Sequence, residues 1–365
     1  MKTIELSSEL IKLHKYEGSA DKSAAVDLIK TYLEKNDLHV ELISSNGVVS
    51  VIGSTKGRKE NSRKIILNGH YDTVPPSDQW TVDPFDPVVK KGELWGLGAC
   101  DMTCNLAAMI NTAIAISKQN LSSEIILIAV GDEEVGGHNG TGATIAKGIT
   151  ANYAVIGEPT AMQLATGHKA RLQIELTAEG KGGHAAYPQD TKNAAHTMAT
   201  ALVALEKEFK LKSHDHEYVF SHPTMNTTLI SGGTAENVVP FQCKATIDFR
   251  LPADIKIEKF TAKLTQLLPE SVKLNIQKNE PGWISDEKSE FIKTAQATLE
   301  KVTGTPISGY LHKLGASDAR YYSKAGIPTI NVGAGNMKLH IPDEKMQLEQ
   351  LRQVEQFYTE LCKKI

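Results

Sequence analysis

Imidazole and carboxylate side chains follow four predicted strands of this sequence, at the point where each strand ends. The strands are short aliphatic runs that end in polar or glycine-marked turns: KIILNG (64–69), EIILIAV (124–130), YAVIG (153–157) and IPTINVG (327–333). The residues that follow them are His70 and Asp72, Asp132 with Glu133 and Glu134, Glu158, and, after a short loop, His340. Ligands bind beyond the carboxyl ends of the strands in an open α/β sheet, so we expect these side chains to share one site.

A metal site explains why these residue types occur together. Imidazole suits zinc and similar ions, carboxylates suit harder cations, and two metals need several shared negative charges. Asp101 follows the GLGAC turn at the start of a predicted helix, where it is placed to bridge two ions. A single acidic loop residue is usually only solvated, but the coincidence at four strand ends favours a metal centre.

The spacing within two of these clusters suggests a division of roles. Asp72 follows His70 by two positions, so both side chains can point the same way, and a metal-bound histidine usually donates its other N–H to a carboxylate. Asp72 would therefore orient His70 without binding the metal. Glu133 and Glu134 are adjacent, so one would bind a metal while the other handles the proton of an attacking water. The residues alone leave the order of this pair open.

The elements that must position these residues alternate between strand and helix. Apolar spacing predicts helices at the start of the chain, on either side of a break near Gly18, and at DMTCNLAAMINTAIAISKQ (101–119). Shorter helices are expected at GTGATIAKG (140–148) and GASDARYYSKAG (315–326). This alternation predicts an α/β fold with a mixed, mostly parallel sheet.

A different pattern begins near His168. A helix is predicted from Asn193 to Phe209, and the segments around it alternate apolar and polar residues. These segments are RLQIELTAEG (171–180), TMNTTLISGG (224–233) and FQCKATIDFRL (241–251). The pattern indicates a smaller α+β domain with one sheet face in solvent. We therefore expect a catalytic domain made of residues 1–167 and 279–365 and an inserted domain made of residues 168–278.

The composition limits the kind of partner. With 365 residues and a formal net charge of -3, the chain can bury a sizeable core but lacks the basic field that non-specific binding to nucleic acid requires. The start, MKTIELSSELIKLHKYEG, has no signal-peptide core, and we find no run of about 20 apolar residues that would span a bilayer. The four cysteines, Cys100, Cys104, Cys243 and Cys362, are too scattered for a disulfide framework. We expect a cytoplasmic protein that contacts neither nucleic acid nor membrane.

Longer stretches around these residues are similar to a known family. They are NGHYDTVPP (68–76), WGLGACDMTCNLAAM (95–109), GDEEVGGHNGT (131–141), GEPT (157–160), GKGGHAAYP (180–188), ENVVP (236–240), IDFR (247–250), GASDARY (315–321) and HIPDE (340–344). In this order the sequence resembles the zinc-dependent acetylornithine deacetylases, succinyl-diaminopimelate desuccinylases, aminoacylases and glutamate carboxypeptidases. The resemblance covers nearly the whole chain.

The resemblance implies a role for each residue of the metal site. Two divalent ions, zinc or else cobalt or manganese, would be bound with Asp101 as the bridge, and Glu133 would be the general base. The implied ligands are His70, Asp101, Glu134, Glu158 and His340. In such enzymes the metals lower the pKa of bound water to about 7 and polarise the scissile carbonyl, while the base moves the proton to the leaving amine.

The resemblance also implies roles outside the metal site. His184 matches a histidine that reaches across a dimer interface and steadies the developing oxyanion, so the inserted domain would serve as a lid and dimerisation domain of a homodimer. Asn237 and Arg250 match substrate-binding positions, and the planar fork of arginine suits a substrate carboxylate. Gly315 and Ser317 match a small-residue loop near that carboxylate, although relatives usually have threonine where Ala316 stands.

Some residues depart from the family pattern or admit another interpretation. Relatives commonly read DMKGG where this chain has DMTCN (101–105), and they have an arginine at the position of Leu97; neither change removes an expected ligand. The thiols of Cys100 and Cys104 could compete for zinc, but the ligand set is complete without them, so we expect both to face the core. A dinucleotide fingerprint at GLG (96–98) is rejected because its third glycine is absent.

Three functions remain open at this point. The preferred one is removal of an acetyl or succinyl group from an N-acyl amino acid, most of all an N-acyl diamino acid. A dipeptidase or carboxypeptidase would use the same metal site. A non-catalytic protein that binds an amino acid would have lost ligands or the base, and this sequence retains them.

Overall fold

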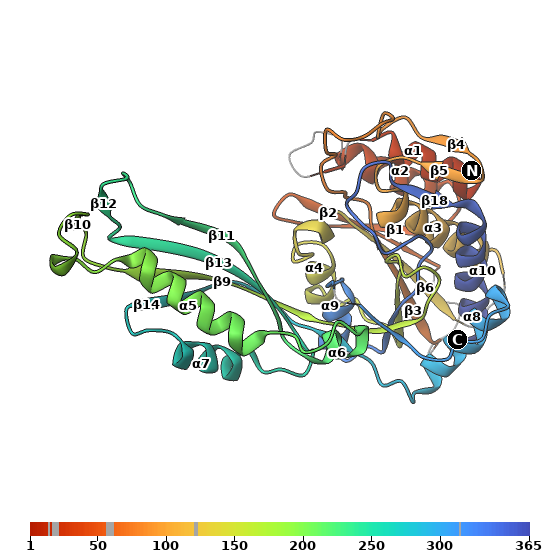
Figure 1. Ribbon diagram of the computed structural model, residues 1–365. Helices are drawn as coiled ribbons and strands as arrows, with labels where there is room; N and C mark the ends of the chain where they lie inside the picture. Colours follow the sequence, from red (N-terminus) through yellow and green to blue (C-terminus); the bar gives the residue numbers. More distant parts are fainter. Residues whose placement is uncertain (14, 17–21, 56–61, 120–122, 314) are drawn as a thin grey trace. The chain divides into compact units, whose positions relative to one another are not determined.

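The computed structural model describes residues 1–13, 15–16, 22–55, 62–119, 123–313 and 315–365 (Figure 1). The chain forms two compact units. The first unit comprises Met1–Thr166, Ser285–Leu311 and Ser317–Ile365, and the second comprises Gly167–Ile284 and His312–Ala316. The second unit is therefore an insertion in the first. The short later segment His312–Ala316 also belongs to the second unit. The expected break near Gly18 lies outside the described residues.

The first unit is built on a mixed sheet. Its strand order is β1 (His39–Ser45), β2 (Val48–Ser54), β6 (Glu124–Val130), β3 (Lys64–His70), β7 (Tyr153–Ile156), β17 (Thr329–Asn331) and β8 (Ala165–His168). The four central strands, β6, β3, β7 and β17, are parallel, and antiparallel pairs lie on both sides of them. β3 and β6 are buried along almost their whole length, which is why their sequences are continuous aliphatic runs. The expected mixed α/β fold is confirmed, with its parallel part at the centre of the sheet.

The helices of the first unit pack around this sheet. They are α1 (Thr3–Ile11), α2 (Lys22–Glu34), α3 (Cys104–Ser117), α4 (Thr141–Ala146), α8 (Glu290–Thr303), α9 (Ala319–Lys324) and α10 (Leu348–Lys364). One continuous core joins apolar side chains of α1, α3, α8 and α10 to those of β3 and β6. A separate small sheet has the order β18 (Lys345–Gln347), β5 (Glu93–Trp95) and β4 (Val88–Lys90).

The helix expected from residue 101 begins later than its apolar spacing predicts. Ala99–Thr103 forms a tight turn in which Asp101 has the non-helical angles φ -115° and ψ 95°, and regular helix starts at Cys104. By length and composition, Ala99–Ser117 could cross a membrane, which the sequence analysis did not expect of any segment. However, 89% of this stretch is buried inside the fold, as it is for the core helix of a folded domain.

The second unit has its own sheet and its own core. The antiparallel order is β11 (Thr224–Gly232), β13 (Gln242–Leu251), β9 (Ala170–Glu179) and β14 (Val272–Glu280). Alternate residues of β9 are buried, as the alternating sequence predicts. They share one core with α5 (Ala194–Phe209) and α7 (Ile257–Leu267), so both helices cover the same face of the sheet (Figure 1).

The remaining elements of the second unit are short. They are β10 (Gly183–His184), the turn Pro188–Asp190, α6 (His216–Ser221), β12 (Val238–Val239), β15 (Trp283–Ile284) and β16 (Leu311–Lys313). β10 pairs with β12, and Trp283 and Ile284 of β15 pair with His168 and Gly167, which also belong to the second unit.

The separate core of the second unit leads to a prediction about stability. Leu176 of β9 is fully buried, so Leu176→Ala should lower the free energy of unfolding by about 2–5 kcal/mol through lost burial and the cavity left behind. Urea unfolding would measure this change. As a control, Glu175→Ala on the opposite face removes a partly exposed ion pair with Lys244 and should cost at most about 1 kcal/mol. Equal losses in the two variants would contradict this assignment of the buried face.

Candidate active site

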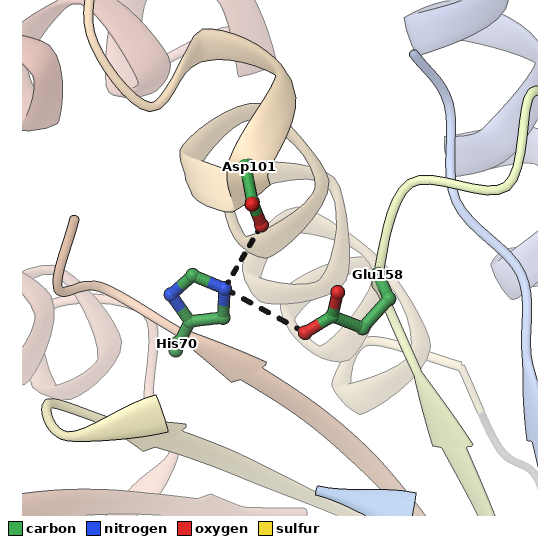
Figure 2. A group of neighbouring side chains, drawn as sticks. All are labelled: His70, Asp101 and Glu158. Atoms are coloured by element: carbon green, nitrogen blue, oxygen red, sulfur yellow. Dashed lines mark hydrogen bonds and ion pairs between the residues drawn. The ribbon is translucent and has the colours of Figure 1, made fainter. Parts of the chain in front are cut away.

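The ends of two adjacent parallel strands bring the first group of site residues together. The register of β3 and β7 pairs Asn68 with Ile156, so His70 and Glu158 each lie two residues beyond this pair. His70 Nε2 lies 3.7 Å from Glu158 Oε1 and 3.2 Å from Asp101 Oδ1. Dashed lines mark these two contacts in Figure 2. All three residues are buried, and each directs a ligand atom into a space that a single ion could occupy.

A second group of residues meets the other oxygen of Asp101. His340 Nε2 lies 3.3 Å from Asp101 Oδ2 and 3.1 Å from Glu134 Oε2. These three residues also direct their ligand atoms at one another. Asp101 therefore presents one carboxylate oxygen to each group, which is the arrangement expected of a ligand that bridges two ions.

The electrostatics of the two groups fit divalent cations. Burial lowers the pKa of His70, but hydrogen bonds to the carboxylates of Asp101 and Asp72 outweigh it and raise this pKa well above its usual value. Hydrogen bonds to Asp101 and Glu134 raise the pKa of His340 to about 10. The carboxylates thus stabilise positive charge at both positions. Two imidazoles and three carboxylates are also a donor set that zinc and related ions accept.

Asp72 orients more of the site than the sequence predicts. His70 Nδ1 lies 2.9 Å from the backbone oxygen of Asp72 and 3.6 Å from its carboxylate, so the carbonyl is the closer acceptor. The Asp72 carboxylate accepts hydrogen bonds from the backbone N–H groups of Glu133, at 3.3 Å, and Glu134, at 3.1 Å. Asp72 therefore contacts the imidazole through both its backbone oxygen and its carboxylate, and the same carboxylate holds the backbone of the glutamate pair.

The two adjacent glutamates have different surroundings. They lie in the short helical turn Glu133–Val135. The Glu134 carboxylate contacts His340, whereas Glu133 belongs to neither group of potential ligands among the described residues. Burial, followed by the negative charge of Glu158, raises the pKa of Glu133 well above its usual range. The division of the pair into one metal ligand and one proton-transferring residue stays a prediction.

Comparison with known proteins bears on what this arrangement does. The sequence profile described as peptidase family M20/M25/M40 matches residues 66–364. The chain belongs to this family. It is 29% identical to a succinyl-diaminopimelate desuccinylase of Marinobacter nauticus, over 98% of this chain and 97% of the relative. The expected resemblance and the expected class, a metal-dependent amide hydrolase, are both confirmed.

Solved structures share the fold of this family member. An M20 family metallo-carboxypeptidase of Sulfolobus solfataricus superposes with a TM-score of 0.84 at 18% identity, covering 100% of this chain and 99% of the other. A peptidase of the same family from Bacillus subtilis, described as binding a dinuclear metal, has a TM-score of 0.76 at 17% identity and covers 99% and 95%.

Two glycines of this M20/M25/M40 family member allow three ligand-bearing segments to approach closely. Gly69 precedes His70, and Gly157 precedes Glu158. A β-carbon would lie 2.6 Å from the terminal methyl carbon of Met102 at Gly69 and 2.5 Å from it at Gly157. Met102 is fully buried next to Asp101, so its side chain fills the space that both glycines leave open.

Several residues without a predicted role hold the glutamate turn in place. The backbone oxygen of Gly136 accepts hydrogen bonds from Arg320 Nη2, at 2.8 Å, and from the Tyr321 hydroxyl, at 2.5 Å. Asp318 accepts a 2.6 Å hydrogen bond from Thr141 Oγ1. The motif GASDARY contains three of these residues and indicated that this segment lies near the site. A single sequence does not reveal which residues they contact.

Glu344 is another residue that lies beside the site and for which the sequence predicted no role. Its buried carboxylate accepts hydrogen bonds from three backbone N–H groups of the turn that carries Asp101. The motif HIPDE (340–344) contains it, four residues after His340.

His184, Asn237 and Arg250, which were expected to contact the substrate, belong to the second unit. In the second unit, His184 is exposed on β10, and the backbone oxygen of Asn237 accepts a hydrogen bond from Ala185 N at 2.9 Å, so His184 and Asn237 are neighbours. Arg250 Nε donates to Asp248 at 2.7 Å, in an ion pair on the surface of β13.

Gly315 and Ser317 differ in burial. Gly315 is exposed and belongs to the second unit, whereas Ser317 is buried in the first unit and accepts a hydrogen bond from Asn331 Nδ2 at 2.9 Å. Their substrate-binding role stays a prediction, as do those of Asn237 and Arg250.

The two cysteines beside Asp101 are buried thiols. Burial raises the pKa of Cys100 far above its usual range and that of Cys104 to about 12. Neither residue belongs to the two potential metal-binding groups found in the described part of the chain. They contribute to the core, as expected, and the cytoplasmic location stays a prediction.

The shared carboxylate predicts how metal content responds to substitution. His340→Ala should lose one ion and keep the ion held by His70, Asp101 and Glu158, whereas Asp101→Ala should lose both because both groups depend on it. Elemental mass spectrometry after dialysis would measure the bound metal. Glu349→Ala, which removes an exposed ion pair with Arg352, is the matched control and should bind metal as the unmodified protein does. Full metal content in Asp101→Ala would rule out the bridging role.

Proposed function

We propose that this family member hydrolyses the amide bond of an N-acyl amino acid, with an N-succinyl or N-acetyl diamino acid as substrate. The observation that carries the proposal is the Asp101 carboxylate, which offers one oxygen to each of two groups of ligand atoms beside Glu133. The likeness to a succinyl-diaminopimelate desuccinylase along nearly the whole length of both chains supports this choice of substrate class.

The proposed ligands are His70, Glu158 and Asp101 for one ion and Asp101, Glu134 and His340 for the other, with zinc, cobalt or manganese as the metal. Bound divalent ions acidify water and polarise a carbonyl group. Glu133 removes a proton from the attacking water and later delivers it to the nitrogen of the leaving amine. The water oxygen forms the new bond to the carbonyl carbon as the C–N bond breaks, giving a carboxylate and a free amine.

The raised pKa of Glu133 suits this proton transfer. A carboxylate of ordinary pKa is a weak base near neutral pH, and burial makes it a stronger one. Asp72 keeps Glu133 close to the first group through the hydrogen bond to its backbone N–H. Both residues therefore act in the first unit together with the metal ligands.

We assign the second unit to substrate recognition and dimerisation. His184 steadies the oxyanion in the site of a partner subunit, and Arg250 and Asn237 hold the substrate carboxylate. Gly315 of the second unit and Ser317 of the first belong to the loop near that carboxylate. The exposed edge of the second unit's sheet supports a homodimer. β11 is an outer strand, and its Leu229 and Ile230 are 68% and 62% exposed. An exposed apolar edge strand readily pairs with another chain.

The substrate class can be tested with a panel of amides. The metal-loaded protein should hydrolyse succinyl-diaminopimelate or acetylornithine faster than dipeptides, and Glu133→Ala should lose activity while retaining metal. Ninhydrin detection of the released amine would measure hydrolysis, and elemental mass spectrometry would measure the metal that Glu133→Ala retains. Cleavage of dipeptides alone would favour the peptidase alternative, and full activity of Glu133→Ala would remove Glu133 as the base.

The role of His184 can be tested by mixing variants. His184→Ala and Glu133→Ala should each be inactive, but dimers that combine them should regain activity because one active site then contains an intact Glu133 and the partner's intact histidine. Activity after joint unfolding and refolding of the two variants would measure this, with sedimentation to establish the oligomeric state. A monomer, or the absence of any recovery in mixed dimers, would contradict the proposal.

A further inference from the structure

The carboxylate of Glu344 binds the backbone of the turn that leads to Asp101. Its Oε1 accepts hydrogen bonds from Cys100 N at 2.6 Å and from Asp101 N at 2.8 Å, and its Oε2 accepts one from Gly98 N at 3.0 Å. Only 6% of Glu344 is exposed. Three backbone N–H groups therefore converge on one buried carboxylate.

The turn has few other means of satisfying these donors. It precedes the regular part of α3, so the N–H groups cannot bond to a preceding helical turn. Gly98 adopts φ 73°, and a β-carbon there would lie 2.6 Å from Thr73 Cγ2, so the turn is confined on its other side. A buried N–H group without an acceptor costs roughly as much as a lost hydrogen bond. The conformation of this turn depends on Glu344.

The backbone of Glu344 is itself fixed by the small sheet. Gly96 N donates to the backbone oxygen of Glu344 at 3.1 Å, and the next residue, Lys345, pairs with Trp95 across β18 and β5. The side chain of Glu344 thus reaches the turn from a rigid support.

The segment that contains Glu344 also contains a proposed metal ligand. His340 Nε2 lies 3.3 Å from Asp101 Oδ2. Residues 340–344 therefore contact Asp101 twice, through its carboxylate at His340 and through its backbone N–H at Glu344. Glu344 is not one of the potential metal ligands among the described residues, because its oxygens face N–H donors.

We propose that Glu344 is the positioning residue that fixes the backbone of Asp101, so that one carboxylate oxygen of Asp101 faces each metal-binding group. This inference rests on the proposed two-metal function. It adds a residue that touches neither metal nor substrate and acts through three hydrogen bonds to the ligand's own turn. Partners of metal ligands at this distance typically change metal affinity or activity about 10–100-fold when they are replaced.

Glu344→Gln tests the proposal with little change in side-chain volume. An amide has one acceptor oxygen, so in either orientation its NH2 group must face at least one of the three N–H donors. The matched control is Asp343→Asn. Asp343 is the neighbouring acid, and its carboxylate accepts hydrogen bonds from Thr81 N and Thr81 Oγ1, away from the Asp101 turn.

The readouts are zinc affinity by competition with a chelating dye and the thermal unfolding of the metal-free full-length protein. We expect Glu344→Gln to bind both ions about 10–100-fold more weakly than the unmodified protein, with activity rescued by excess zinc. Asp343→Asn should keep the unmodified affinity. Glu344→Ala should weaken zinc binding further. If this variant does not fold, the zinc affinity of Glu344→Gln alone tests the positioning role.

Unmodified zinc affinity in Glu344→Gln would overturn the positioning role. If the metal-free form of that variant also had a lower melting temperature, Glu344 would be a purely structural residue. Failure of the proposed function looks different, because the unmodified protein itself would then fail to bind two ions.

Discussion

The site is organised by one carboxylate that faces two groups of ligand atoms. Each oxygen of Asp101 lies close to a different histidine, so both groups depend on the position of a single side chain. Buried carboxylates that converge in this way repel one another unless positive charge lies between them. The surrounding structure is therefore arranged to hold several separate chain segments against that repulsion.

Much of the fold could be predicted because its signals are local. The aliphatic run 124–130 is β6 from end to end, and the alternation in residues 171–179 matches the buried and exposed faces of β9. His70 and Glu158 could be placed together because the ends of adjacent parallel strands meet at one edge of the sheet. Such patterns depend only on neighbouring residues and on the period of a strand.

What could not be predicted depends on contacts between distant parts of the chain. Apolar spacing placed a helix start at residue 101, but Asp101 N donates a hydrogen bond to Glu344, a residue 243 positions later, and Asp101 lies outside the helix. The Asp72 carboxylate was expected to orient His70 and lies 3.6 Å from His70 Nδ1, but the hydrogen bonds that it accepts from the backbone of Glu133 and Glu134 were not predicted. Periodicity carries no information about such partners, and the family resemblance supplied ligand positions without their supports.

The packing of Met102 between two glycines has a consequence for how this sequence can change. A β-carbon added at position 69 or 157 would meet the terminal methyl group of Met102, the residue that follows Asp101, so the Met102 side chain would have to shift. A smaller side chain at position 102 would relieve this contact but leave a cavity next to Asp101. At position 157 the Met109 Cε atom would still lie 2.9 Å from the added carbon. The volume that positions 69 and 157 can accept therefore depends on the methionine side chains packed against them, and even an alanine there is not a neutral change.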